Sequence, residues 1–165
     1  MSTQPRSAWT WIALLLRLAL GALFALSAYT KLSDPQAFAF SVHAFEILPE
    51  HLVRFATFAI PWTEALCAAF LLVGLWTRSA ATLTGFMLLV FIWAIDSVLD
   101  RGMSVSCGCF GENFKGFCGK NLSSCNLIQN WVLTGLAAAV TMLGYGRLGL
   151  DGLCGTAPNH VPRAA

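Results

Sequence analysis

Four of the six cysteines lie close together in one polar stretch of the chain, at Cys107, Cys109, Cys118 and Cys125. Cysteines clustered in this way are typical of disulfide chemistry or of a soft-metal site. Zinc ligands usually come in pairs with two to four residues between them, whereas the gaps here are one, eight and six residues and the stretch has no histidine. We therefore expect disulfides in an oxidising compartment and no metal site.

Four cysteines allow three pairings, and the sequence does not choose among them. We favour Cys107 with Cys109 and Cys118 with Cys125, because Gly108 permits the bend that brings residues two apart within disulfide distance. Such a tight ring is expected to be strained, and strain makes a disulfide a better oxidant of other thiols. These four cysteines are the candidate catalytic residues. The alternative is that all four only staple a loop with little core of its own.

The other two cysteines are expected to be inert. Cys67 lies in the middle of a long apolar run, where a thiol is most often a small packing residue. Cys154 lies in the C-terminal tail and is expected to stay a free thiol.

Two charged residues, Arg17 and Glu64, stand alone in long apolar runs. An unpaired charge in hydrocarbon costs several kcal/mol, so we expect each to pair with the other inside the protein. Counted from Trp9 and Trp76 at the ends of their runs, they lie at depths of about 12 and 18 Å, a difference that an arginine side chain spans. The pair would either fix which helices adjoin or form a proton or ligand site, and a quinone headgroup is the cofactor that such a site suggests.

The elements that must position these residues are four apolar runs. Of the 165 residues, 57% are hydrophobic and 11% are charged, whereas about 25% are charged in an ordinary soluble domain. A helix crosses the bilayer core with roughly 20 apolar residues, and runs of that length occupy residues 9–29, 55–76, 80–99 and 127–146. We predict an all-α integral membrane four-helix bundle that forms a single domain over residues 1–165.

The connections between the runs differ in length. Residues 77–79 leave room only for a tight turn, so the second and third runs are predicted to form a helical hairpin. The first long loop, residues 30–54, contains Asp34 and Pro35, a helix N-cap followed by proline at the first helical position. Apolar residues then recur at helical spacing, at Phe38, Val42, Phe45 and Leu48. We expect a short interfacial helix there, covering one mouth of the bundle.

The second long loop, residues 100–126, holds the four clustered cysteines, and residues 147–165 form a tail. With four spans, both termini and residues 77–79 lie on one side of the membrane and both long loops on the other. Lys and Arg number four on the first side and five on the second, but the four lie in a shorter length of chain. The positive-inside rule therefore favours cytoplasmic termini and a periplasmic Cys-rich loop.

Net charge bears on the choice of partner. The net charge is +2 and the ten Lys and Arg residues are scattered, so the basic patch of a nucleic-acid binder is missing. The expected partners are the lipid bilayer, other proteins or small molecules.

Several short motifs occur along the chain, in this order: Arg17 with Leu20-Gly21, Lys31-Leu32-Ser33-Asp34-Pro35, Leu48-Pro49, Pro61-Trp62-Thr63-Glu64, Leu72-Val73-Gly74-Leu75 and Cys107-Gly108-Cys109-Phe110-Gly111. Together they make residues 12–145 similar to the MauE branch of the DoxX-like membrane proteins, and the Cys-Gly-Cys-Phe-Gly run is the most specific of them. Two features depart from the usual pattern. Residues 117–124 look like an addition to the loop, and Gln129 stands where relatives often carry arginine.

The resemblance implies a four-helix, redox-associated protein of the bacterial inner membrane. Its namesake serves methylamine utilisation and is thought to help mature the disulfide-rich small subunit of methylamine dehydrogenase in the periplasm, alongside a thioredoxin-like protein. By this resemblance, Cys107 and Cys109 would be the redox-active pair. The expected function is thiol–disulfide redox support for a periplasmic client, either as an oxidoreductase or as an accessory maturation factor. The alternatives are a small-molecule or metal carrier that uses the loop cysteines as soft ligands, and a noncatalytic subunit of a larger membrane complex.

Overall fold

The computed structural model describes residues 6–103 and 123–143, and these residues contain five α-helices. Their bounds are α1 Arg6–Ser33, α2 Pro35–Ala44, α3 Glu50–Val73, α4 Thr77–Asp100 and α5 Ser124–Leu143. No β-strand occurs in these residues. The predicted all-α class is therefore confirmed for the described part of the chain.

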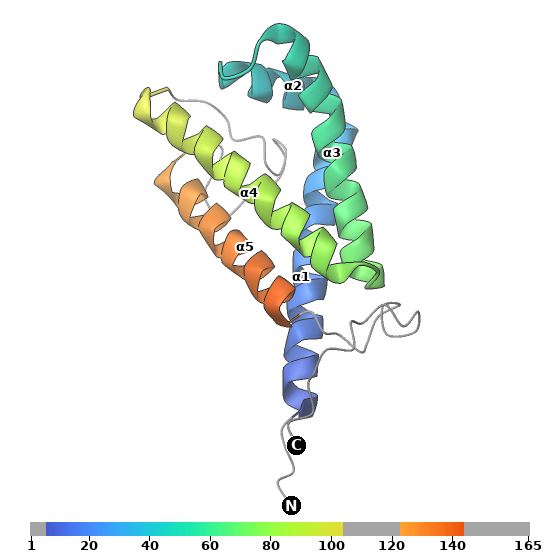
Figure 1. The fold of residues 1–165 in the computed structure, drawn as a ribbon. Coiled ribbons are helices and arrows are strands. Elements are labelled where there is room, and N and C mark those ends of the chain that lie inside the picture. Colours follow the sequence, from blue (N-terminus) through green and yellow to red (C-terminus); the bar gives the residue numbers. More distant parts are fainter. Residues whose placement is uncertain (1–5, 104–122, 144–165) are drawn as a thin grey trace, which may run out of the picture.

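The four long helices form two antiparallel pairs, α1 with α3 and α4 with α5, and α2 lies across one end (Figure 1). In the first pair, a Cβ built on Gly21 would lie 3.1 Å from the Leu72 side chain. In the second pair, a Cβ built on Gly85 would lie 3.6 Å from the Cβ of Ala137. Small residues at these contacts let the helix backbones approach closely.

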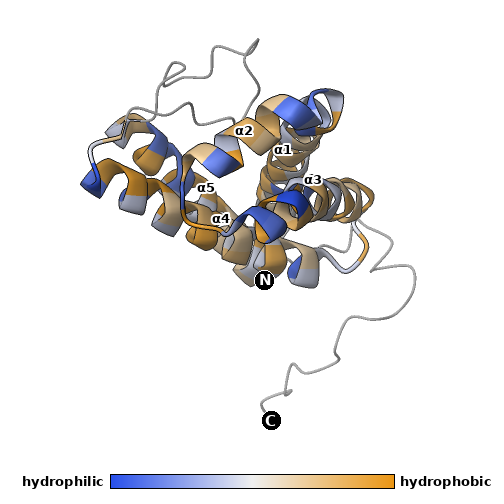
Figure 2. Cartoon of the chain, turned by 90° about the horizontal axis from the view of Figure 1, so that it is seen from above, coloured by the Kyte–Doolittle hydropathy of each residue, from blue (hydrophilic) through white to orange (hydrophobic). Residues whose placement is uncertain are grey.

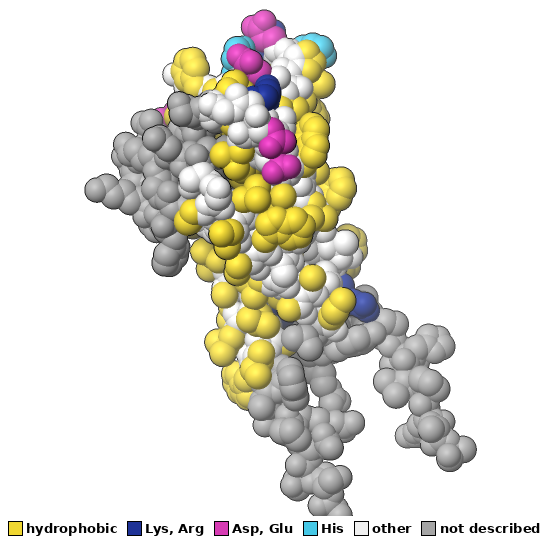
Figure 3. All heavy atoms as spheres, turned by 90° about the vertical axis from the view of Figure 1, so that its left-hand side faces the viewer, with side chains coloured by type: hydrophobic (Ala, Val, Ile, Leu, Met, Phe, Trp, Pro, Cys, Tyr) yellow, Lys and Arg dark blue, Asp and Glu magenta, His cyan; other side chains and the backbone are white. Residues whose placement is uncertain are grey.

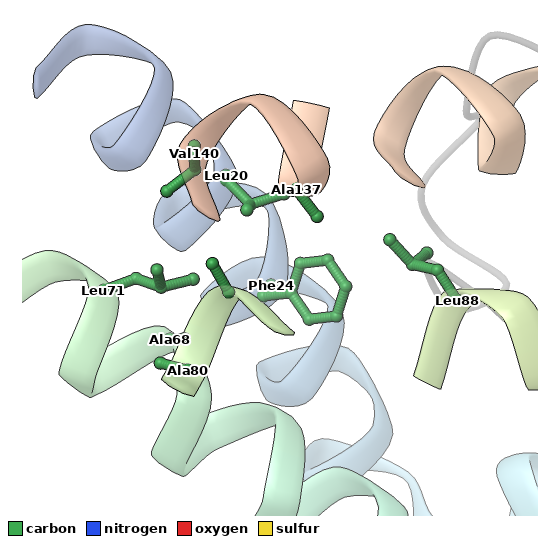
Figure 4. Close-up of a cluster of buried hydrophobic side chains, with 9 residues drawn as sticks. Leu20, Phe24, Ala68, Leu71, Ala80, Leu88, Ala137 and Val140 are labelled. Atoms are coloured by element: carbon green, nitrogen blue, oxygen red, sulfur yellow. The ribbon is translucent and has the colours of Figure 1, made fainter. Parts of the chain in front are cut away.

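A hydrophobic core joins the two pairs in the half of the protein that carries the α3–α4 turn. All four long helices contribute to it, through Leu20, Phe24, Ala68, Leu71, Ala80, Ala81, Leu88, Ala137 and Val140 (Figure 4). The alanines leave room for the Phe24 ring, and leucine and valine side chains surround it. Because interiors are close-packed, this core holds the helices in one register.

Three helices in residues 6–103 and 123–143 are long and apolar enough to cross a membrane: Trp11–Ser33 within α1, Glu50–Val73 and Thr77–Asp100. Large apolar side chains on their outer faces, such as Phe58, Phe86 and Trp93, are exposed. Figure 3 shows one face that is largely hydrophobic, with acidic and histidine side chains gathered at the α2 end. Seen from that end, hydrophilic residues cluster on and around α2 (Figure 2). An apolar surface of this extent is the kind that lipid covers.

The fifth helix, α5, is not among these three candidates. Its first two turns carry three amide side chains, Asn126, Gln129 and Asn130, which lower its hydropathy. It nevertheless packs along α4. A fourth membrane crossing, and with it the four-helix membrane bundle, therefore stays a prediction.

The turn between α3 and α4 consists of Gly74, Leu75 and Trp76. Gly74 has a left-handed φ of 77° and Trp76 a φ of 49°. The N–H groups of Gly74 and Leu75 both donate to the Phe70 carbonyl, at 2.8 and 3.0 Å. The sequence predicted a tight hairpin but placed its turn at residues 77–79, which was wrong. The left-handed conformation of Gly74 ends α3, but Leu75 and Trp76 after it are apolar. Hydropathy therefore does not show where the helix ends.

The first long connection contains a short helix, α2, where the Asp34-Pro35 pattern predicts one. Asp34 is its N-cap, and the carboxylate accepts a hydrogen bond from the Ala37 N–H at 3.0 Å. The inner face of α2 packs on α3, where Phe38 and Val53 share a buried cluster. As a result, α2 covers the end of the α1–α3 pair.

Candidate functional site

A buried ion pair joins α1 to the middle of α3. Lys31 Nζ donates to Glu64 Oε1 at 2.5 Å, and Ser27 Oγ donates to Glu64 Oε2 at 3.2 Å. Ser27 and Lys31 are four residues apart on α1, so both face the same carboxylate. Lys31 is 3% exposed and Glu64 is 6% exposed. Both carboxylate oxygens therefore have a donor inside the protein.

The ammonium group of Lys31 also lies over two aromatic rings. Its Nζ is 5.2 Å from the Phe38 ring centroid and 5.8 Å from that of Phe91. Phe38 belongs to α2 and Phe91 to α4. A cation over an aromatic face is attracted by the ring quadrupole, more strongly when it is desolvated. Side chains from α1, α2, α3 and α4 thus meet at one charged group.

The predicted pairing of Arg17 with Glu64 was wrong. Gly21 lies against Leu72 and Ser27 against Glu64, so the antiparallel register places Arg17 level with the turn after α3. That is about 15 Å along the axis from Glu64, beyond the reach of an arginine side chain. Depths counted from the ends of the two apolar runs mislead because those ends are not level: α1 projects past the α3–α4 turn (Figure 1). Arg17 is itself buried.

Lys31 is a site residue that the sequence did not predict. The apolar run ends at Tyr29, which puts Lys31 in the predicted loop, but α1 continues to Ser33. The sequence did contain a signal for the longer helix. Asp34 caps the next helix, so it is the single residue between the end of α1 at Ser33 and the start of α2 at Pro35. With α1 extended to this cap, the spacing from Ser27 to Lys31 puts both on one helix face.

Next to the ion pair, α3 and α4 bring a buried thiol and a buried hydroxyl side chain together. Cys67 is one turn after Glu64, is buried as a free thiol, and lies beside the Thr84 side chain. Its burial agrees with the predicted role of a small packing residue. Among the described residues, no group of three or more His, Cys, Asp or Glu side chains is arranged to hold a metal ion.

Most of the predicted catalytic cysteines lie outside the described residues, namely Cys107, Cys109 and Cys118. Cys125 is described: it lies in the first turn of α5 and is disulfide-bonded. The pairing that the sequence favours is therefore a prediction still.

The base of the Cys-rich loop is described on both sides. Arg101, the C-cap residue after α4, donates a hydrogen bond from Nη2 to the Phe45 carbonyl at 2.6 Å, next to the end of α2. The Phe45 ring packs edge-on against Phe91, with centroids 6.3 Å apart. Met103 in the first part of the loop and Leu127 just after it pack on the same buried cluster. Both ends of the loop therefore rest beside α2, at the opposite end of the protein from the Gly74–Trp76 turn.

Long helices with apolar outer faces and a charged pair inside define a multi-helix integral membrane protein. Comparison with known families specifies it further: the model of the family "Methylamine utilisation protein MauE" matches residues 9–143, and the chain belongs to this family.

Two relatives carry the same name. The methylamine utilization protein MauE of Paracoccus denitrificans is 33% identical over 138 residues, which cover 83% of this chain and 69% of the relative. That of Paracoccus versutus is 33% identical over 129 residues, covering 78% of this chain and 67% of the relative. No solved structure matches the chain.

Proposed function

We propose that this protein is an inner-membrane thiol–disulfide exchange factor that supports maturation of the methylamine dehydrogenase small subunit in the periplasm. The observation that carries the proposal is the family match, because it extends over residues 9–143 and so includes all four loop cysteines. The relatives are named for methylamine utilisation. Clustered cysteines supply the chemistry that a disulfide-rich client needs.

The proposed reaction is disulfide exchange at Cys107 and Cys109. A client thiolate attacks one sulfur of the Cys107–Cys109 disulfide, so a mixed disulfide forms and the other cysteine leaves as a thiolate. A second client thiolate then attacks the mixed disulfide, which releases an oxidised client and a reduced Cys107–Cys109 pair. Two electrons pass from client to pair, and the two client protons are released or taken up by the new thiols.

The reduced pair must pass its two electrons on. We propose that Cys118 and Cys125 relay them, and that the acceptor is a periplasmic thioredoxin-like protein or a membrane quinone. The placement of both loop ends beside α2 supports a single working face at that end. In the proposed orientation this face is periplasmic and the Gly74–Trp76 turn and both termini are cytoplasmic.

The test uses a methylamine-grown bacterium whose own copy of this protein is replaced by variants of the full chain. With Cys107→Ser, we expect methylamine dehydrogenase small subunit with free thiols, measured by alkylation and mass spectrometry, while the variant still accumulates in the membrane. Cys154→Ser is the matched control and should leave the client fully oxidised. Cys109→Ala removes the disulfide that the client thiolate attacks, so it should leave the client with free thiols as Cys107→Ser does. A client that matures normally with Cys107→Ser would refute the proposed exchange.

A further inference from the structure

The short helix α2 contacts the buried ion pair near its start and the base of the Cys-rich loop just past its end. Near its start, the Phe38 ring lies 5.2 Å from the Lys31 ammonium of the buried ion pair. Just past its end, the Phe45 carbonyl accepts from Arg101 at 2.6 Å and the Phe45 ring packs against Phe91. Phe91 itself contacts the Lys31 ammonium. The ion pair and the base of the Cys-rich loop are therefore joined through α2 and through one ring of α4.

A ten-residue helix moves as a rigid unit, so its two ends are not independent. The Asp34 cap fixes where α2 begins, only one residue after α1 ends. If the Phe38 end moves, the Phe45 end must tilt with it. Met103 and Leu127, which pack on the Phe45 cluster, lie on either side of residues 104–122. A tilt of α2 would thus reach both sides of the loop at once.

We propose that α2 couples the buried Lys31–Glu64 pair to the Cys-rich loop, so that Lys31 and Arg101 are positioning residues for the exchange reaction. The redox part of this inference rests on the proposed function, whereas the mechanical part does not. The mutual attraction of Lys31 and Glu64 keeps the ammonium beneath α2. When Glu64 is replaced by an uncharged residue, the ammonium loses its counter-charge and is drawn toward water at the α2 end. It then displaces Phe38, and the loop base moves with α2.

The mechanical part is tested by amide hydrogen exchange on the full chain in lipid nanodiscs. Glu64→Gln removes the charge of the carboxylate, and Phe38→Leu removes the ring over the ammonium while keeping an apolar side chain. Both variants should raise the amide exchange rate about twofold or more in α2, and by the same factor in residues 97–103 and 124–127. Arg54→Gln, which changes an exposed charge on α3 near the same end, should leave the exchange rates of all these segments unchanged. Faster exchange in α2 without faster exchange in residues 97–103 and 124–127 would overturn the coupling. If Glu64→Gln does not accumulate in the membrane, the result with Phe38→Leu decides the test.

The redox part is tested by equilibrating the same nanodiscs with glutathione buffers and measuring the oxidised fraction of the loop cysteines. Arg101→Gln should shift the equilibrium constant about twofold or more, and Arg101→Lys, which keeps a cationic donor for the Phe45 carbonyl, should restore it. The double variant Glu64→Gln with Arg101→Gln should shift the equilibrium constant by less than the product of the two single shifts. If the cysteines exchange with glutathione but no variant changes the equilibrium constant, the positioning role is refuted. If the wild-type cysteines do not exchange at all, the proposed function fails, and the hydrogen-exchange result still decides the coupling.

Discussion

Replacing Glu64 alone should damage the protein far more than replacing both members of the ion pair. In Glu64→Leu, the Lys31 ammonium, which is 3% exposed in the wild-type protein, loses its only ion-pair partner among the described residues, so it must either stay buried without a counter-charge or push α2 aside to reach water. Ser27 loses the acceptor of its 3.2 Å hydrogen bond in the same variant. Breaking a buried ion pair from one side costs about 3–5 kcal/mol. Some of this is offset because leucine buries more apolar surface than glutamate, which leaves about 3 kcal/mol.

The double variant Lys31→Met with Glu64→Leu removes both charges and keeps long side chains at both positions. Replacing a buried ion pair by apolar residues of similar volume is often neutral or stabilising. The methionine sulfur can still contact the Phe38 and Phe91 rings, which now surround the ammonium. We therefore expect the free energy of unfolding to lie within about 1 kcal/mol of wild type or above it.

The buried thiol of Cys67 provides the assay. It is a free cysteine in the interior of α3, so a maleimide labels it only when the helices separate. Its labelling rate in mixed micelles, read by mass spectrometry of the Cys67 peptide, should rise roughly a hundredfold in Glu64→Leu, the equivalent of about 3 kcal/mol. The double variant should label close to the wild-type rate. Glu50→Leu, at an exposed position in the first turn of α3, is the control and should stay within about 1 kcal/mol.

A mild effect of Glu64→Leu, similar to that of Glu50→Leu, would refute this reasoning. It would mean that Lys31 reaches water without displacing α2, and that α2 does not close over the ammonium. A double variant as damaged as the single one would refute it in a different way. The cost would then come from packing at residue 64, and the charge of the pair would have no part in it.

Three further changes test the local structure. Gly21→Val should cost about 1–3 kcal/mol in the same labelling assay, because even a Cβ at this position would lie 3.1 Å from Leu72 and the added methyl groups must push α1 and α3 apart. Asp34→Ala removes the acceptor for the Ala37 N–H and should cost about 0.5–2 kcal/mol, seen as faster amide exchange in α2 with little change in the α1–α3 core. Gly74→Ala forces a side chain into the left-handed φ of 77° and should lower stability by about 1 kcal/mol, measured by chemical unfolding of the full chain.

The all-α architecture and most of the α2 geometry were predictable from the sequence. Long apolar runs leave helices as the structure that satisfies every backbone group in lipid, and Asp34 followed by Pro35 is a local signal that needs no tertiary contact. The burial of Cys67 was predictable for the same reason, because it lies in the middle of an apolar run. Glu64 was identified as a candidate site residue because a lone carboxylate in such a run must find a partner.

The identity of that partner was decided by tertiary structure alone. Hydropathy describes how apolar a segment is along the chain, but it does not say which residues of two helices lie level with each other. The close contact of Gly21 with Leu72 sets that register and brings Ser27 and Lys31 to Glu64, while it leaves Arg17 near the other end of α3. Whether a residue meets a partner on another helix depends on packing between side chains far apart in sequence, and packing of that kind leaves no periodic signal in either helix.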